Sequence, residues 1–168
     1  MLRERLGNKQ IIAEDLGFMT DSVKRLVRKT GYPNMKIIQF AFDPDGDSEH
    51  MPHNYGNNCV VYTGTHDNDT IAHWYPALKR RQKAYVKSYL GLKSGRGICD
   101  AVIRNVLASV ADTAVIPMQD YLGLGGEARM NVPSTLGTNW KWRMRSDALT
   151  PELSAKLKEW AVVYRRTV

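Results

Sequence analysis

Two acidic residues stand where apolar runs of the sequence open into loops. Glu14 directly follows the run 11–13, and Asp67 follows the run 60–62 after a Thr-Gly-Thr-His step. Buried strands of a parallel (β/α)8 barrel read as continuous apolar runs, and the catalytic groups lie just past their C-terminal ends. The pattern therefore predicts two carboxylates on the active-site face of a barrel. An acid after a strand can instead cap the next helix or form a salt bridge within the loop, and this alternative stays open.

The elements that would position these acids form an α/β pattern. Four short apolar runs alternate with helical patterns, which is typical of βα units and of a parallel sheet. The expected strands cover residues 10–13, 36–42, 59–62 and 114–118.

The expected helices have recognisable ends. Thr20 is the expected N-cap of the first helix, and Gly31 with Pro33 ends it. The apolar stripe of this helix consists of Val23, Leu26 and Val27. Further helical patterns cover residues 70–74, 76–90 and 98–110.

The segment 150–168 is expected to form a C-terminal covering helix. Thr150 would be its N-cap and Pro151 its first helical residue. Its apolar residues recur at helical spacing and would face inward. They are Leu153, Leu157, Trp160, Ala161 and Tyr164. We expect this helix to cover the barrel rather than to extend the site.

Two long stretches, 43–58 and 121–142, do not show a regular pattern. Both follow expected strands, so both would be βα loops on the catalytic face. They combine glycine, Asn, Asp or His with aromatic rings. Such loops suit a carbohydrate, because the C–H faces of a sugar lie against flat rings while its hydroxyls form hydrogen bonds with polar side chains. Core packing is the alternative for the tryptophans, and it is favoured for Trp74 and Trp160.

Composition excludes several classes of protein. Hydrophobic residues make up 43% of the chain and charged residues 24%, which is ordinary for a soluble globular protein. A chain of 168 residues is long enough for one domain with a core, whereas a complete barrel needs about 250. No apolar run approaches the roughly 20 residues of a membrane span, and no secretory signal is visible. Cys59 and Cys99 form neither a disulfide framework nor a zinc spacing, which fits a cytoplasmic protein.

The net charge of +7 does not by itself indicate a nucleic-acid partner. The basic residues are spread along the chain, and the groups at 24–29 and 79–83 fit the solvated faces of helices. No motif that reads RNA or DNA accompanies them. We therefore expect no nucleic-acid partner and no membrane partner.

Five motifs are distinctive as a set. They are Ala13-Glu14-Asp15-Leu16-Gly17, Gln39-Phe40-Ala41-Phe42-Asp43, Pro52-His53-Asn54-Tyr55, Thr65-His66-Asp67-Asn68-Asp69-Thr70 and Gly126-Glu127-Ala128-Arg129-Met130-Asn131. In order and rough spacing they resemble the 4-alpha-glucanotransferases (amylomaltase or disproportionating enzyme, glycoside hydrolase family 77). The resemblance extends through nearly the whole chain.

The resemblance implies a fold and a length. This family belongs to the alpha-amylase clan of (β/α)8 barrels, and the four apolar runs would be its strands five to eight. Residues 1–168 would then form a single partial catalytic-barrel domain, the C-terminal half of a barrel. The family's nucleophilic Asp lies upstream of its Glu-bearing strand, and no Asp precedes Glu14 here. The nucleophile and strands one to four would therefore lie upstream of this chain.

The resemblance also implies roles for particular residues. Glu14 would be the acid/base and Asp67 the auxiliary acid, while His66 would bind the donor sugar ring. Asp43 and Asn139 lie in loops that line the family's sugar subsites. The substrate would be a maltodextrin or a glucan derived from starch or glycogen. We expect no cofactor, no metal ion and, as a further partner, the missing N-terminal half.

Two rival interpretations stay open. One is a metal-dependent hydrolase that uses the imidazoles of His50, His53 and His66 and the carboxylates of Asp67 and Asp69, although their spacing fits no familiar metal site. The other is a non-catalytic remnant or one piece of a split enzyme. Half a barrel would leave unpaired strand edges, which favour association with another chain.

Overall fold

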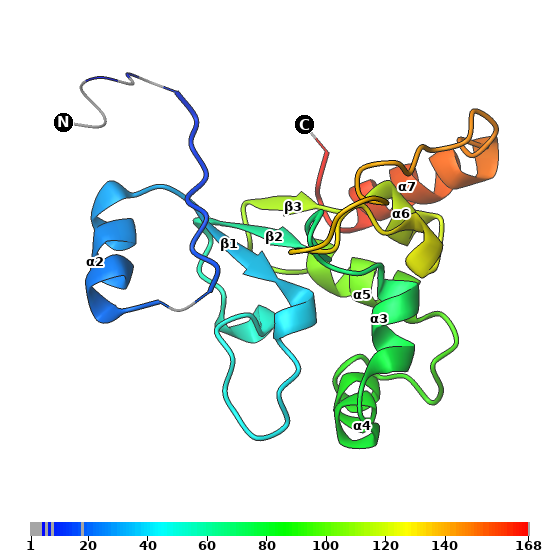
Figure 1. The fold of residues 1–168 in the computed structure, drawn as a ribbon, viewed down its shortest axis with the longest axis horizontal. Helices are drawn as coiled ribbons and strands as arrows, with labels where there is room; N and C mark the ends of the chain where they lie inside the picture. Colours follow the sequence, from blue (N-terminus) through cyan, green and yellow to red (C-terminus); the bar gives the residue numbers. More distant parts are fainter. Residues whose placement is uncertain (1–4, 6, 8, 18, 168) are drawn as a thin grey trace.

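The computed structural model describes residues 5, 7, 9–17 and 19–167 and shows a parallel three-stranded sheet flanked by helices (Figure 1). The strands are β1 (Asn34–Ile37), β2 (Cys59–Tyr62) and β3 (Thr113–Val115), in the order β1-β2-β3. Ile37 is paired in register with Tyr62, and Tyr62 with Val115, so the three strands end at one level. The α/β class and the parallel sheet are confirmed.

The described residues include six α-helices. They are α2 (Asp21–Thr30), α3 (Ile71–Ala77), α4 (Arg80–Tyr89), α5 (Ile98–Leu107), α6 (Met118–Tyr121) and α7 (Pro151–Val163). Three short 3-10 helices lie in the connections: η1 (Ile38–Phe40), η2 (Pro52–Asn54) and η3 (Gly126–Ala128). The predicted helices at 70–74, 76–90 and 98–110 correspond to α3, α4 and α5.

The predicted strand at 10–13 is wrong in extent, because only a single bridge forms there. Ala13 pairs in parallel with Asn34, and its N–H donates to the Pro33 carbonyl at 2.8 Å. The carboxylate of Asp15 accepts the next backbone donor, the Met35 N–H, at 3.0 Å. Just past the bridge, the Asp15 side chain rather than a strand backbone thus accepts the hydrogen bond of the Met35 N–H.

The predicted strands at 36–42 and 114–118 are too long at their C-terminal ends. After Ile37 the chain turns into η1, although Ile38 and Phe42 are buried. After Val115 it soon enters α6. The first run continues because the chain returns to the core after strand pairing stops, whereas in the second Val115 is exposed and Ile116 is only partly buried. The strand predicted at 59–62 is confirmed residue for residue.

The main core lies between the sheet and helices α3, α4 and α5. Its fully buried members include Ile38, Val61, Ile71, Val86 and Val102. Each is buried against side chains from distant parts of the sequence, which is the dominant stabilising contribution in a domain of this size.

The C-terminal helix α7 begins at the predicted residue and packs on α5. The Thr150 hydroxyl accepts the Leu153 N–H at 3.2 Å, and Pro151 is the first helical residue. Trp160 is buried against Ile103 and Leu107 of α5 in a second core cluster. The helix therefore covers the face of α5 that carries Ile103 and Leu107.

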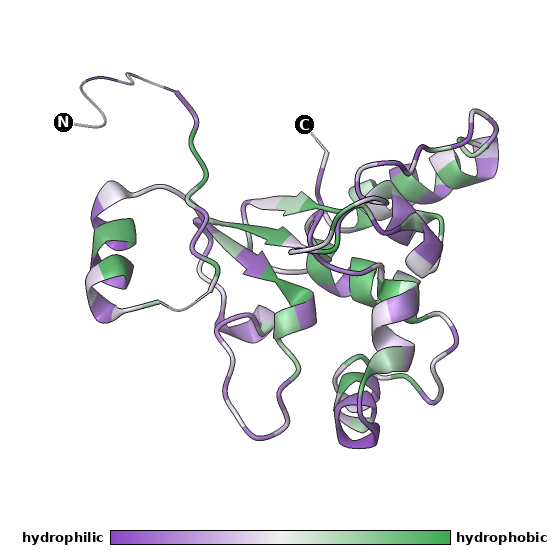
Figure 2. Ribbon diagram, viewed as in Figure 1, coloured by the Kyte–Doolittle hydropathy of each residue, from purple (hydrophilic) through white to green (hydrophobic). Residues whose placement is uncertain are grey.

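Helix α2 has the predicted ends but an unburied stripe. The Thr20 hydroxyl accepts the Val23 N–H at 3.4 Å, and Gly31 ends the helix at φ 66°. Leu26 is 61% exposed, and none of the residues of α2 is buried. Figures 1 and 2 show this helix at one end of the molecule, with its apolar residues in green.

Candidate functional site

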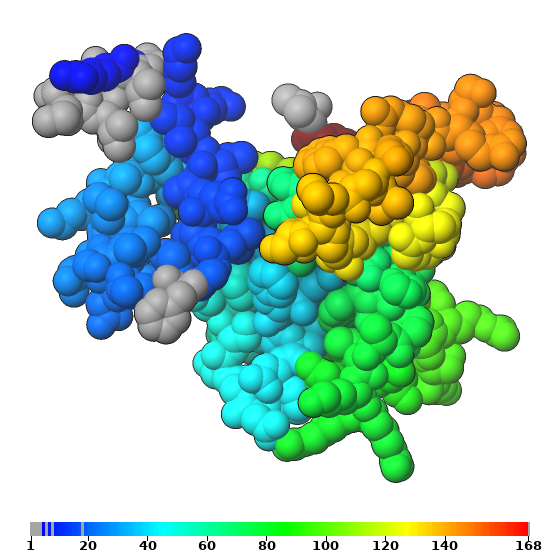
Figure 3. Space-filling model, in the orientation of Figure 1, coloured from blue at the N-terminus to red at the C-terminus, as the bar shows by residue number. Residues whose placement is uncertain are grey.

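A cavity of about 1040 Å³ opens at the level where the three strands end. Four segments line it: 12–17, 35–50, 62–70 and 115–130. In Figure 3 the blue segment before α2 and the yellow to orange segment after β3 stand on opposite sides of cyan and green atoms. The C-terminal ends of parallel strands are where α/β folds bind ligands, so this cavity is the candidate site.

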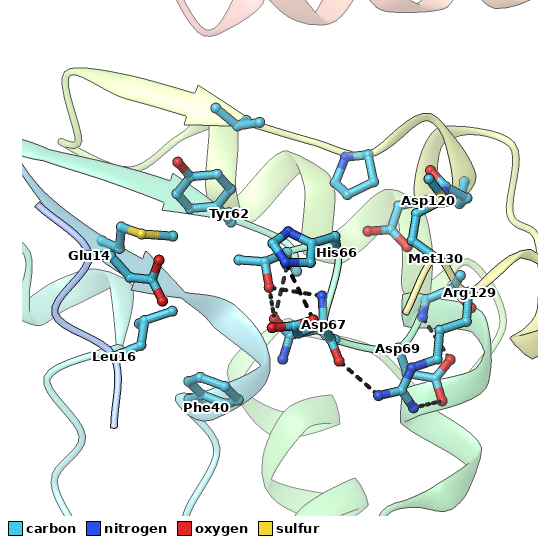
Figure 4. A pocket seen from close by; sticks show the side chains of 18 of the residues that line it. Glu14, Leu16, Phe40, Tyr62, His66, Asp67, Asp69, Asp120, Arg129 and Met130 are labelled. Atoms are coloured by element: carbon cyan, nitrogen blue, oxygen red, sulfur yellow. Dashed lines mark hydrogen bonds and ion pairs between the residues drawn. The ribbon is translucent and has the colours of Figure 1, made fainter. Parts of the chain in front are cut away.

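Glu14, His66 and Asp67 all line this cavity. Figure 4 shows Glu14 on one side, with the Tyr62 ring beside it, and His66 with Asp67 across from it. Burial, and then the negative charge of Glu14, raise the pKa of the Tyr62 hydroxyl. The structure therefore brings the two predicted carboxylates, 53 residues apart in sequence, to one cavity.

Asp15 anchors the Glu14 segment, and sequence reasoning missed it. Its two carboxylate oxygens accept the Met35 N–H at 3.0 Å and the Asn34 side-chain amide at 3.2 Å. Together with the Ala13 bridge, these bonds fix the backbone on both sides of Glu14. Two successive acids after an apolar run were the only signal in the sequence, and it did not say which one faces the cavity.

A tight turn presents His66 and Asp67 at its tip. The Thr65 N–H and the Thr65 hydroxyl both donate to Asn68 Oδ1 at 2.9 Å. Gly64 is needed before the turn because a Cβ there would lie 2.6 Å from Gln39 Nε2. That amide in turn donates to the Asp69 carbonyl at 2.7 Å.

The segment after η3 holds Asp67 from the other side. Asn131 Nδ2 donates to Asp67 Oδ1 at 2.6 Å, and His66 Nε2 lies 3.4 Å from the same oxygen. Arg129 donates from Nη2 to the Asp67 carbonyl at 2.8 Å and from Nε to the Asn131 carbonyl at 2.9 Å. Both Arg129 and Asn131 belong to the 126–131 motif, but their sequence gave no indication of these contacts.

Neither predicted acid serves as a helix cap. Thr20 caps α2. The first N–H of α3, on Ile71, donates to Asp120 Oδ1 at 2.8 Å, and the preceding Thr70 N–H donates to Asp69 Oδ1 at 2.9 Å. Asp69 also accepts His73 Nδ1 at 2.6 Å and Arg129 Nη1 at 3.4 Å. The capping alternative therefore applies to Asp69 and Asp120, and it leaves Glu14 and Asp67 facing the cavity.

Asp120 is a buried carboxylate at the floor of the cavity, only 2% exposed. It accepts the Thr63 hydroxyl and the Ile71 N–H. Burial raises the pKa of Asp120, and these two donors partly offset the effect. Asp120, in α6, thus connects the end of β2 and the start of α3, the two ends of the loop that carries His66 and Asp67.

Replacing Asp120 tests this connection. Asp120→Ala is expected to lower the free energy of unfolding by about 2 to 4 kcal/mol, because the Thr63 hydroxyl and the Ile71 N–H lose a buried acceptor. Asp120→Asn is expected to cost less than about 1 kcal/mol, since an amide can accept one bond and donate the other. Urea denaturation measures both. Equal losses in the two variants would contradict the role of these hydrogen bonds.

The same pair of variants has an expected pH dependence. The raised pKa means that the folded protein retains a proton on Asp120 longer than the unfolded chain. The stability that the protonated Asp120 side chain contributes is therefore complete at low pH and is lost as the pH rises through the raised pKa. Asp120→Asn should remove this part of the pH dependence.

Trp140 contacts the candidate site through His66. The two rings lie 5.0 Å apart at 38°, and Trp140 is half exposed. Its φ of 63° is rare for a bulky residue, and its N–H donates to the Met130 carbonyl at 2.7 Å. An exposed ring beside His66 fits the predicted use of aromatic residues in this loop. Trp160, in contrast, is in the core, as predicted.

Asp43 and Asn139 are not among the residues that line the cavity. Asp43 Oδ1 accepts the Asp45 N–H at 3.0 Å within its own exposed loop. Asn139 accepts the Val132 N–H at 3.0 Å and donates to the Thr135 carbonyl at 3.1 Å. In this structure both side chains organise loops.

The metal alternative gains no support from the geometry. Within the described part of the chain, no group of three or more His, Cys, Asp or Glu side chains is arranged to hold a metal ion. His53 contacts the Tyr89 hydroxyl at 3.2 Å instead.

None of the described helices is long and apolar enough to cross a membrane.

Comparison with known families decides the assignment. The family model described as 4-alpha-glucanotransferase, glycoside hydrolase family 77, matches residues 1–150. The chain belongs to this family. The five motifs had predicted this membership, and it is confirmed.

Two relatives that match this chain are considerably longer than it. It is 45% identical to a 4-alpha-glucanotransferase of Clostridium butyricum over 99% of its own length and 34% of that protein. It is 47% identical to one from Streptococcus pneumoniae over 98% of its length and 33% of that protein. The chain thus spans about a third of the length of these relatives and corresponds to a C-terminal portion of them.

A solved structure agrees with the fold. The chain is similar to the amylomaltase of Streptococcus agalactiae, solved in complex with acarbose, with a TM-score of 0.92 and 42% identity. The similarity covers 98% of this chain and 33% of that one. At this level of agreement, the strands and helices described above match one portion of that amylomaltase structure.

Proposed function

We propose that the protein containing this chain transfers segments of α-1,4-glucan between maltodextrins with retention of configuration. The observation that carries this proposal is the position of Glu14 and Asp67 across one cavity at the strand ends. Family membership supports the reaction, since the relatives are named 4-alpha-glucanotransferases. The similar amylomaltase was solved with acarbose, which supports a sugar-binding cavity.

In this proposal Glu14 is the acid/base. Retaining transfer needs a nucleophilic carboxylate and a second carboxyl group roughly 5 to 5.5 Å from it. Glu14 would protonate the leaving oxygen as the nucleophile attacks the anomeric carbon. It would then accept the proton of the incoming sugar hydroxyl as the covalent intermediate breaks down. The nucleophilic Asp would come from the upstream part of the protein.

Asp67 and His66 would hold the donor sugar. Hydrogen bonds from ring hydroxyls to the Asp67 carboxylate strengthen as positive charge develops on the ring, so they lower the barrier more than they tighten binding. Asn131 supports this role, because its bond to Asp67 Oδ1 fixes the orientation of the carboxylate. The tight turn at 65–68 keeps His66 beside it.

The finer architecture is also part of the proposal. The extended segment 10–13 and strands β1, β2 and β3 would be strands five to eight of a (β/α)8 barrel. Residues 1–168 would form one partial catalytic domain, with 150–168 covering it. The parallel order β1-β2-β3 and the amylomaltase similarity support this arrangement. The cytoplasmic location stays a prediction from the cysteines, since a relative from Solanum tuberosum is named chloroplastic/amyloplastic.

The products formed from maltotriose test the proposed reaction. A glucanotransferase converts maltotriose into glucose and longer maltodextrins, whereas a hydrolase gives glucose and maltose without longer products. The assay would compare three preparations. The first is this chain alone, and the second is this chain mixed with a separate chain that consists of the N-terminal two thirds of the Clostridium butyricum relative. The third is this chain fused to that segment, which gives a single completed enzyme. Glucose together with a ladder of longer products from the completed enzyme supports the proposal. Hydrolysis alone, or no turnover by a folded completed enzyme, refutes it.

The split-enzyme interpretation is the second candidate, and the unpaired edge of the sheet is compatible with it. Strand β3 pairs only with β2 among the described strands, and Val115 is 41% exposed at this edge. An edge of this kind can pair with another chain. Activity only after the N-terminal segment is added as a separate chain would support a two-piece enzyme. Activity of this chain alone would exclude it.

A further inference from the structure

We propose that His50 is a glucan-binding residue, whose Nε2–H donates a hydrogen bond to a sugar hydroxyl on the Glu14 side of the cavity. This inference rests on the proposed function and adds a residue to it. His50 lines the cavity together with Glu14, Leu16, Met35 and Phe40.

One ring nitrogen of His50 is used by the backbone. Nδ1 accepts the Ile37 N–H at 3.1 Å, at the last residue of β1. A nitrogen that accepts a hydrogen bond carries no proton, so the neutral ring carries its proton on Nε2. The backbone of β1 therefore sets the tautomer, and Nε2 is the donor.

Hydrogen bonds hold the backbone of His50, and the Ile37 N–H and the Phe40 ring contact its side chain. The His50 N–H donates to the Ser48 hydroxyl at 3.2 Å, and the Tyr55 hydroxyl donates to the His50 carbonyl at 2.8 Å. The Phe40 ring packs edge-on at 5.5 Å and 80°. A donor with a fixed position loses little entropy when a ligand binds.

The electrostatic surroundings keep the ring neutral. Burial lowers the pKa of His50, and the positive charge of Lys36 lowers it further, against the opposing charges of Glu49 and Asp15. Lys36 is itself buried, and its ammonium lies 2.7 Å from Glu49 Oε2. A neutral ring agrees with Nδ1 as an acceptor.

The second nitrogen is free to meet a ligand. Among the described residues, the buried side-chain polar atoms without a hydrogen-bond partner are Thr70 Oγ1 and Asn105 Oδ1. Nε2 of His50 is not in this set and has no hydrogen-bond partner among the described residues, so it is not fully buried, and the residue that carries it lines the cavity. A neutral donor in a cavity that the apolar Met35 and Phe40 also line suits a sugar, which offers a hydroxyl beside C–H groups.

Two substitutions separate binding from structure. Asn places its side-chain oxygen where Nδ1 lies and keeps an acceptor for Ile37, but it does not reach the Nε2 position. Gln places its amide near Nε2 and keeps the donor, but it leaves the Ile37 N–H without an acceptor. The measurements are kcat and KM for maltotriose, acarbose affinity by calorimetry, and the melting temperature, all on the completed enzyme.

For His50→Asn we expect the KM for maltotriose to rise about fivefold, with a smaller change in kcat and an unchanged melting temperature, because a hydrogen bond to bound substrate is lost. For His50→Gln we expect a KM near that of the wild type and a melting temperature lower by roughly 2 °C, because the Ile37 N–H loses its acceptor.

Two results would contradict a binding role of His50. A KM within twofold of wild type for His50→Asn, or parallel losses of kcat and melting temperature in both variants, would show that His50 only supports β1. If the wild-type completed enzyme does not transfer glucan, the proposed function fails. The acarbose affinity of His50→Asn then tests the role of His50 separately. A wild-type affinity overturns that role, and a fivefold loss of affinity supports it.

Discussion

Glu14→Gln in the completed enzyme is expected to lower glucose release from maltotriose by about a thousandfold, within the range that general acid–base catalysis contributes. Gln is nearly isosteric with Glu but cannot give up or accept the proton. Glu14 has no capping role, and the neighbouring segment is held by Asp15 and Ala13. The fold should therefore be unchanged, and the loss should appear in kcat.

A matched control and a second substrate sharpen this prediction. Glu159→Gln makes the same chemical change at an exposed position of α7 and should leave turnover unaffected. A maltosyl fluoride donor needs little protonation of its leaving group, so Glu14→Gln should recover much of the first step with it. Maltotriose turnover within tenfold of the wild type would rule out Glu14 as the acid/base.

Asp67→Asn is expected to reduce kcat by about a hundredfold with a smaller change in KM. The carboxylate would stabilise the positive charge that develops on the donor ring, and an interaction made chiefly in the transition state lowers kcat rather than binding. An amide oxygen can still accept the bond from Asn131, so the turn should keep its shape.

Asp112→Asn is the control for this second prediction. Asp112 is exposed, lies just before β3, and is not among the residues that line the cavity. Its substitution should leave kcat unchanged. If Asp67→Asn raised KM while kcat stayed at the wild-type value, Asp67 would only bind the substrate, and its proposed part in the transition state would be refuted.

Apolar periodicity predicted the elements better than their ends. The run at 59–62 is β2 without a shift, because it is buried and paired along its whole length. In the run at 36–42, Ile38, Ala41 and Phe42 are buried after Ile37 although the chain turns into η1, and Phe40 is exposed. The run at 10–13 forms a single bridge, and Ile12 is 48% exposed. Apolar sequence reports burial, whereas a strand also requires a partner for its backbone.

Helix ends were predictable because caps are local. Thr20 and Thr150 each accept an N–H three residues on, and Gly31 takes a left-handed φ. The surfaces that these helices pack against were not predictable in the same way. The stripe of α2 is exposed, whereas that of α7 includes the buried Trp160. A helix's own sequence does not specify the surface that it meets.

By itself, the sequence determined that this chain is α/β, that Glu14 and Asp67 follow apolar runs, and that its motifs are those of 4-alpha-glucanotransferases. These features depend on residues close together in the chain. Tertiary structure decided which acids face the cavity and which cap helices. It did so through contacts between residues about 50 or 60 positions apart, such as Asp120 with Ile71 and Asn131 with Asp67. Hydrogen bonds of this range depend on how the loops meet in space, and no local pattern encodes that.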